Sequence, residues 1–142
     1  MNQDNFRIFV GIDLGRWLHA AKVINSNGEF LAKRGFDHSY EGLAETVDWL
    51  LKFAQQDAAR IAVGIEVPHG SVVETLLQRG IAVFAINPKQ LDRFRDRYAV
   101  SGAKDDPRDA FVLADTLRTD RHRFQRLCIQ PPEIIALKQF LS

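Results

Sequence analysis

The spacing of the first three apolar runs is the strongest constraint on the fold. These runs are rich in the β-branched and aromatic residues of strands, and they read RIFVGID (7–13), HAAKVINS (19–26) and FLAKRGFDH (30–38). The links between them are too short for the crossover that parallel neighbours need. The second link contains Asn27-Gly28, a strong hairpin signal between apolar runs. The sequence therefore predicts an antiparallel three-stranded meander.

After the meander the hydrophobic period changes. Apolar side chains in the next segment recur at i, i+4, i+7, i+8 and i+11, which places them on one face of a helix. Each later strand is reached through a helix, and this favours parallel pairing. The predicted elements are a helix (39–56), a strand (60–67), a helix (71–80), a strand (81–87) and three further helices (88–98, 106–120 and 131–142).

The resulting order, β-β-β-α-β-α-β-α-α, predicts an α/β fold. Three antiparallel strands followed by βαβ crossovers give a mixed five-stranded sheet flanked by helices. The natural arrangement puts the fourth strand beside the first. This order is the pattern of the ribonuclease H-like fold, an analogy that concerns the fold alone.

Composition excludes several classes of protein. The chain has 142 residues, of which 46% are hydrophobic and 26% charged, as in a single globular domain. Its one cysteine excludes an intramolecular disulfide framework and a cysteine-rich zinc site. No apolar run approaches the roughly 20 residues of a membrane helix, and the N-terminus lacks the order of a signal peptide. We therefore expect a cytoplasmic protein.

Two apolar runs end in the same way. VGID (10–13) closes the first predicted strand and VGIE (63–66) closes the fourth. If these strands are parallel neighbours, Asp13 and Glu66 emerge together at the carboxyl edge, where open α/β sheets place their ligands. Strands lie about 4.8 Å apart, so the two carboxylates repel unless a cation lies between them. A divalent metal such as Mg²⁺ fits, although each acid could also simply face water and begin a turn.

A second pair of acids lies in DPRDA (106–110). Pro107 suits the first helical position, which makes Asp106 the N-cap and places Asp109 at N3. Capping and the helix dipole explain both acids without a metal. Their spacing also puts them on one helix face, so the two explanations are compatible. Together with Asp13 and Glu66 they could hold two metal ions about 4 Å apart, as in phosphodiester chemistry.

An ordered set of motifs resembles a known family. The chain is similar, over about residues 6–140, to the N-terminal RuvC-like domain of the DEDD transposases of insertion-sequence family one-ten. The motifs that carry the resemblance are GIDLG (11–15), GIEVPHG (64–70), AINPKQLDRFR (85–95), KDDPRDA (104–110) and ADTL (114–117). The resemblance assigns the acid tetrad to Asp13, Glu66, Asp106 and Asp109. The family usually has threonine where this chain has Asp105, which leaves Asp105 as an alternative third acid.

The resemblance implies a bacterial or archaeal DNA transposase or recombinase acting at the nucleoid. Its expected activity is Mg²⁺- or Mn²⁺-dependent DNA strand cleavage and transfer, with two ions. Expected partners are DNA, a guide (bridge) RNA that chooses the site, and further copies in a homo-oligomer. We expect a catalytic domain over residues 1–125 and the start of a following helical segment over 126–142. The C-terminal domain with its nucleophilic serine is expected to lie outside this chain, and the fragment alone could be inactive.

Basic residues gather near the expected acids, although the net charge is only +1. Residues 89–126 contain ten Lys or Arg and seven Asp, a pattern typical of a solvated helix face or of a phosphate-binding surface. As nucleic-acid contacts the candidates are Lys104, Arg108, Arg93 and Arg97. Solvated charge is the alternative for each. Both tryptophans and most phenylalanines are expected in the core.

Three other functions remain open. GIDLG also resembles the first phosphate loop of actin/Hsp70-type ATPases and sugar kinases, but Arg16 and Trp17 follow where a small hydroxyl residue is usual. A stand-alone Holliday-junction resolvase would use the same acids. A structural or RNA-binding module would use them only as caps and turns.

Overall fold

The computed structural model describes residues 5–66, 70–96 and 108–128. Within these ranges it contains six strands, four α-helices and two short 3₁₀ helices. Their bounds are β1 Ile8–Asp13, β2 Leu18–Asn25, β3 Phe30–Asp37, α1 Tyr40–Phe53, η1 Ala58–Arg60, β4 Ile61–Ile65, α2 Gly70–Gln78, β5 Ala82–Ala85, α3 Pro88–Arg95, α4 Arg108–Asp120, η2 Arg121–Arg123 and β6 Gln125–Arg126.

The strands form one mixed sheet in the order β3-β2-β1-β4-β5-β6. β1, β2 and β3 pair antiparallel, whereas β4 is parallel to both β1 and β5. The predicted meander is therefore confirmed, as is the place of the fourth strand beside the first. The Asn27-Gly28 turn joins β2 to β3, and Gly28 takes a positive φ of 84° there.

The predicted number of five strands was wrong. β6 adds a two-residue antiparallel strand to the open edge of β5. Backbone hydrogen bonds hold β6 against β5. Just after β6, the Leu127 amide donates to the Val83 carbonyl at 2.8 Å. Both residues of β6 are exposed, so no apolar alternation marks this strand in the sequence.

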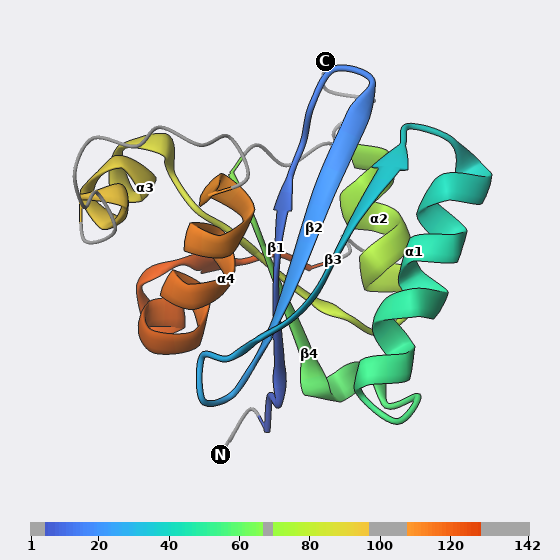
Figure 1. The fold of residues 1–142 in the computed structure, drawn as a ribbon, viewed down its shortest axis with the longest axis horizontal. Coiled ribbons are helices and arrows are strands. Elements are labelled where there is room, and N and C mark those ends of the chain that lie inside the picture. The colour runs from blue at the N-terminus through green and yellow to red at the C-terminus, as the bar shows by residue number, and fades with distance from the viewer. Residues whose placement is uncertain (1–4, 67–69, 97–107, 129–142) are drawn as a thin grey trace, which may run out of the picture.

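Helices cover both faces of the sheet. Figure 1 shows α1 and α2 on one side and α3 and α4 on the other. β1 alternates accordingly: Ile8, Val10 and Ile12 belong to the core under α1 and α2, whereas Phe9 belongs to the core under α3 and α4. The sheet therefore separates two buried apolar clusters. None of the helices within the described ranges is long and apolar enough to cross a membrane.

One tryptophan lies outside the core, contrary to expectation. Trp17 is 77% exposed in the β1–β2 connection. Trp49 is half-buried in α1, with its ring edge-on to Phe53 at a centroid distance of 5.1 Å. Hydrophobicity alone predicted burial for both, but a hairpin tip offers no second layer against which Trp17 could pack.

α4 lies very close to the sheet at two paired glycines. Gly11 of β1 lies opposite Gly64 of β4. A Cβ atom on Gly11 would lie 1.8 Å from the Ala110 carbonyl oxygen, and one on Gly64 would lie 3.2 Å from the Leu113 carbonyl oxygen. The glycine shared by VGID and VGIE thus lets the helix backbone rest directly on the sheet.

We predict that Gly11→Ala severely destabilises the protein, because a backbone oxygen cannot move away as a flexible side chain could. Overpacking costs about 1–3 kcal/mol in typical cores, and this substitution should exceed that range. Gly64→Ala should cost about 1 kcal/mol, since its contacts are tight but not overlapping. Urea unfolding followed by circular dichroism measures both.

Gly35→Ala is the matched control for this series. It also lies in a strand, but its added Cβ would meet nothing closer than 3.7 Å. Its free energy of unfolding should stay within about 0.5 kcal/mol of wild type. If Gly11→Ala and Gly35→Ala lower the free energy of unfolding equally, the close contact with α4 is not the cause of the destabilisation.

Candidate acidic site at the carboxyl edge of the sheet

Asp13 and Glu66 end up beside each other because β1 and β4 are in matching register. Ile12 pairs with Ile65, so one further step places Asp13 opposite Glu66. Each acid follows its glycine by two residues and therefore shares that glycine's face of the sheet. Both side chains are half-buried on the α3/α4 face. Their metal-binding and catalytic roles stay predictions.

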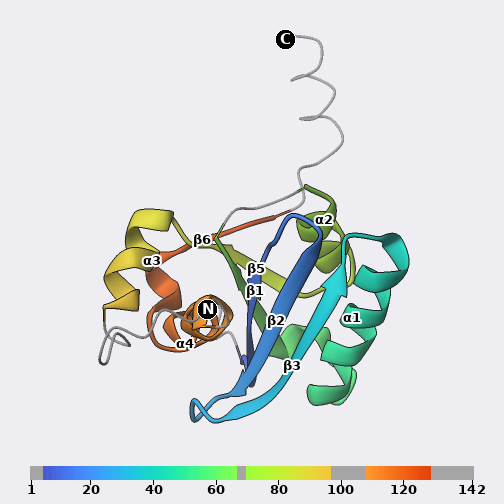
Figure 2. The ribbon, with the colours of Figure 1, turned by 45° about the horizontal axis from the view of Figure 1, so that its top comes forward.

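The first turn of α4 lies at the same edge. α4 runs antiparallel to β1, since Gly11 faces Ala110 whereas Gly28, beyond the other end of β1, faces Arg118. Residues that precede Ala110 in this helix therefore lie toward Asp13, at a rise of 1.5 Å per residue. The views in Figures 1 and 2 both place α4 against β1. The helix thus brings the backbone of Asp109 toward the two strand-end acids.

Several predicted residues cannot be placed as side chains. Arg108 and Asp109 are described only as part of the α4 backbone. Lys104, Asp105, Asp106 and Arg97 lie outside the described residues. Their predicted roles are neither supported nor contradicted by the structure.

An arginine that sequence reasoning did not select reaches the acidic edge. Arg95 of α3 places Nη2 3.7 Å from Oε2 of Glu66, and its Nη1 also donates to the Asp92 carboxylate. The predicted Arg93 lies elsewhere, at a hollow shared with Gln90 and Arg123. The sequence offered only the Asp92–Arg95 spacing of three on a helix, which indicates that pair and not the contact with Glu66.

The start of α3 fixes where Arg95 lies. Asn87 caps the helix, with its Oδ1 accepting from the Lys89 amide at 2.8 Å, and Pro88 follows at the first helical position. Gln90 Oε1 accepts from the Asn87 amide at 3.3 Å and completes a capping box. The Asn-Pro motif therefore sets the helix that delivers Arg95 to Glu66.

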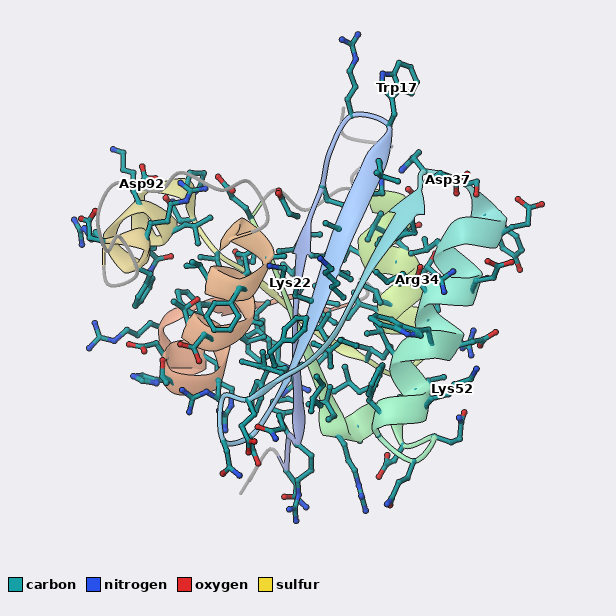
Figure 3. The ribbon with its side chains drawn as sticks, viewed as in Figure 1. Trp17, Lys22, Arg34, Asp37, Lys52 and Asp92 are labelled. Atoms are coloured by element: carbon teal, nitrogen blue, oxygen red, sulfur yellow. The ribbon has the colours of Figure 1, made fainter. Side chains whose placement is uncertain are left out.

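Lys22 is a second cation on this face that sequence reasoning did not select. It pairs with Gly11 across the β1–β2 ladder, and directly opposed residues share a face of the sheet. Lys22 is half-buried and is labelled on β2 in Figure 3. Lys22 is thus a diagonal neighbour of Asp13 on this face, and Arg95 of α3 approaches Glu66.

The described part of the edge offers two carboxylates for a metal. No group of three or more His, Cys, Asp or Glu side chains that could hold an ion occurs among the described residues. Carboxylate oxygens are nevertheless the ligands that Mg²⁺ takes, with water and phosphate oxygens in its other positions. Asp13 and Glu66 fit such an ion as part of its ligand set.

A separate hollow of about 210 Å³ opens on the opposite face of the sheet. The buried His19 of β2 places Nε2 3.1 Å from Nδ1 of His38, and Ser39 and Thr75 also line this space. The sheet lies between this histidine pair and the acids. We therefore do not include it in the acidic site.

Comparison with known proteins identifies the family. A family model for the DEDD transposases of IS110, described as a transposase, matches residues 10–142. The chain belongs to the IS110 family of DEDD transposases. The match extends over both glycine-acid motifs and over the whole of α4.

Two curated relatives are similar over most of this chain. "Putative transposase y4uE" of Sinorhizobium fredii (strain NBRC 101917 / NGR234) is 45% identical over 96% of the chain and 38% of its own length. "Mini-circle putative transposase for IS117" of Streptomyces coelicolor (strain ATCC BAA-471 / A3(2) / M145) is 39% identical over 89% of the chain and 31% of its own length. The chain thus spans about a third of these relatives.

A solved structure of lower similarity is the ROK family transcriptional regulator that is a homologue of the E. coli MLC protein. It aligns with 70% of this chain and 32% of its own at 18% identity, with a TM-score of 0.41. That score is too low to bear on the fold or the function.

We predict a weak coupling between Glu66 and Arg95 in a double-mutant cycle. Glu66→Gln, Arg95→Gln and the double variant should give an interaction energy of about 0.2–1 kcal/mol, because both side chains are partly exposed and the gap is 3.7 Å. Thermal unfolding at low and high salt measures it. The coupling should shrink with added salt, and a salt-independent value would mean that the contact is not electrostatic.

Proposed function

We propose that this chain is the metal-dependent nuclease-type domain of an IS110 DNA transposase. The observation that carries the proposal is the register between β1 and β4, which brings Asp13 and Glu66 to one edge with the first turn of α4 beside them. Asp106 and Asp109 would complete the tetrad from the start of that helix. The substrate would be a DNA phosphodiester.

We further propose that the fold is of the ribonuclease H-like, RuvC-like type. Support comes from the strand order β3-β2-β1-β4-β5, with the first three strands antiparallel and β4 and β5 parallel to β1 and to each other. β6 extends this order at the free edge of β5 without changing it. Open α/β sheets bind ligands beyond the carboxyl ends of their strands, and the acids lie there.

The chain's own residues would position the carboxylates at the cleavage site and balance their charge. Asp13 and Glu66 present their carboxylates from rigid strand ends, while the contact of α4 with Gly11 sets the distance of the helix start. Two Mg²⁺ or Mn²⁺ ions, when bound, would stabilise the attacking and leaving oxygens of a phosphodiester. Arg95 and Lys22, at the rim of the acids, would favour the approach of an anionic backbone.

DNA strand transfer, guide-RNA site choice and homo-oligomer formation belong to the same proposal. They follow from the family and concern a protein about three times as long as this chain. The nucleophilic serine would come from that further part. Lys104, Arg108, Arg93 and Arg97 are the proposed phosphate contacts on this chain, with Arg93 exposed on α3.

The test is excision and integration by the complete protein with Asp13→Asn and Glu66→Gln. Each variant should lose roughly 100-fold or more of its activity, because a missing carboxylate weakens metal binding and transition-state stabilisation. Glu74→Gln, an exposed acid on α2, is the matched control and should be unchanged. Wild-type activity in both acid variants would refute the catalytic assignment and leave a structural module.

Metal binding is tested separately by thermal unfolding with Mn²⁺, Mg²⁺ or ATP. A metal at about 100 times its Kd stabilises a folded protein by about 2.7 kcal/mol. The melting temperature of the wild type should therefore rise, and that of the two acid variants should not. ATP without metal should have no effect. Stabilisation that requires ATP would instead support the ATPase alternative.

A further inference from the structure

The tip of the β1–β2 hairpin carries exposed apolar surface that the fold does not explain. Trp17 is 77% exposed and Leu18 is 64% exposed. Figure 3 shows Trp17 at the outer end of the hairpin, pointing away from the body of the protein. A large aromatic side chain left in water contributes little to folding, and such side chains are common at binding sites.

The hairpin holds Trp17 in a defined place. Asp13 pairs with Ala20, which closes the connection between β1 and β2. Within it, a Cβ on Gly15 would lie 2.1 Å from the Leu18 carbonyl oxygen, so the backbone approaches itself too closely there for any side chain. A short, tightly turned connection loses less conformational freedom on binding than a long flexible one.

Trp17 is also tied to the acidic edge. It follows Asp13 by four residues, so their Cα atoms lie at most about 14 Å apart. Both belong to the same hairpin, and Asp13 is the last residue of β1, where the connection to β2 begins. A ligand bound at the acids therefore continues within reach of the indole.

A cation accompanies the indole. The guanidinium carbon of Arg16 lies 5.6 Å from the centre of the Trp17 ring, within the range of a cation–π interaction. An aromatic plane beside an arginine matches a nucleotide, whose base stacks while its phosphate meets the positive charge. A base inside a duplex is covered on both faces by its neighbours, so only an unpaired base can stack in this way.

We propose that Trp17 and Arg16 form a stacking site for an unpaired base of the nucleic acid whose backbone lies at the acidic edge. The inference rests on the proposed function for the identity of that ligand. The site would hold the strand on one side of the reacting phosphate, a few nucleotides away. Trp17 acts here through binding and takes no part in the chemistry.

Fluorescence tests the stacking through the difference between the wild type and variants of the two tryptophans of this chain, Trp17 and Trp49. The probe is oligothymidylate of about 16 nucleotides, added to the complete protein without metal so that no cleavage occurs. Stacking should quench the Trp17 emission, and Trp17→Phe should remove that quenching while Trp49→Phe keeps it. Quenching that is as large in Trp17→Phe as in the wild type would overturn the proposal.

Affinity provides the second measurement. Trp17→Ala should raise the Kd for the single-stranded probe roughly 5- to 150-fold, the range of one base on an aromatic side chain, while Trp17→Phe retains most of the affinity. Binding of a duplex of equal length should change less than twofold. Arg16→Ala should lower the salt dependence of single-strand binding, since one phosphate contact is lost. An unchanged Kd for Trp17→Ala contradicts the inference.

The outcomes separate this inference from the proposed function. Asp13→Asn should abolish excision yet keep the quenching by oligothymidylate, since the two sites use different side chains. If the wild type shows no quenching while excision still depends on Asp13 and Glu66, the stacking site is refuted and the proposed function is not. The exposed tip could instead bind a second copy of the chain. Trp17→Ala would then abolish self-association in sedimentation experiments without affecting oligonucleotide binding, which also overturns the proposal.

Discussion

The contact between the backbone of α4 and the paired glycines of β1 and β4 is the constraint on which the rest of the structure depends. Gly11 and Gly64 lie side by side in the sheet, and both face this helix. No other residue type allows a carbonyl oxygen to lie as close as the Ala110 oxygen lies to Gly11. The glycines therefore fix the distance and direction of α4, and with them the place where its first turn meets the strand ends.

The same arrangement determines the electrostatics of the acidic edge. Two neighbouring carboxylates at the ends of buried strands are unfavourable by themselves, because like charges repel strongly where water is partly excluded. Arg95 approaches Glu66 from α3, and Lys22 lies on the same face of the sheet from β2. Cations from α3 and β2 thus lie on the same face as the acids that end β1 and β4. Such mixed charge suits a site that must accept both a metal and an anionic polymer.

The course of the chain was predictable where local signals were strong. The short links and Asn27-Gly28 gave the meander, and the helix between strands gave parallel pairing of β4 with β1. β6 was missed because two exposed residues held by backbone hydrogen bonds leave no pattern. Trp17 was assigned to the core by its hydrophobicity, although its position between two strands of a hairpin leaves it at the tip.

For the candidate site, the sequence by itself determined which residue types end the strands: VGID and VGIE specify an apolar strand, a glycine and an acid. It also specified where α3 begins, because Asn87 and Pro88 are local capping signals. Only the tertiary structure decided that the two glycines face one helix and that Arg95, rather than Arg93, reaches Glu66. The physical reason is range: caps, turns and periodicity act over a few residues, whereas the partner of a side chain depends on how distant elements pack.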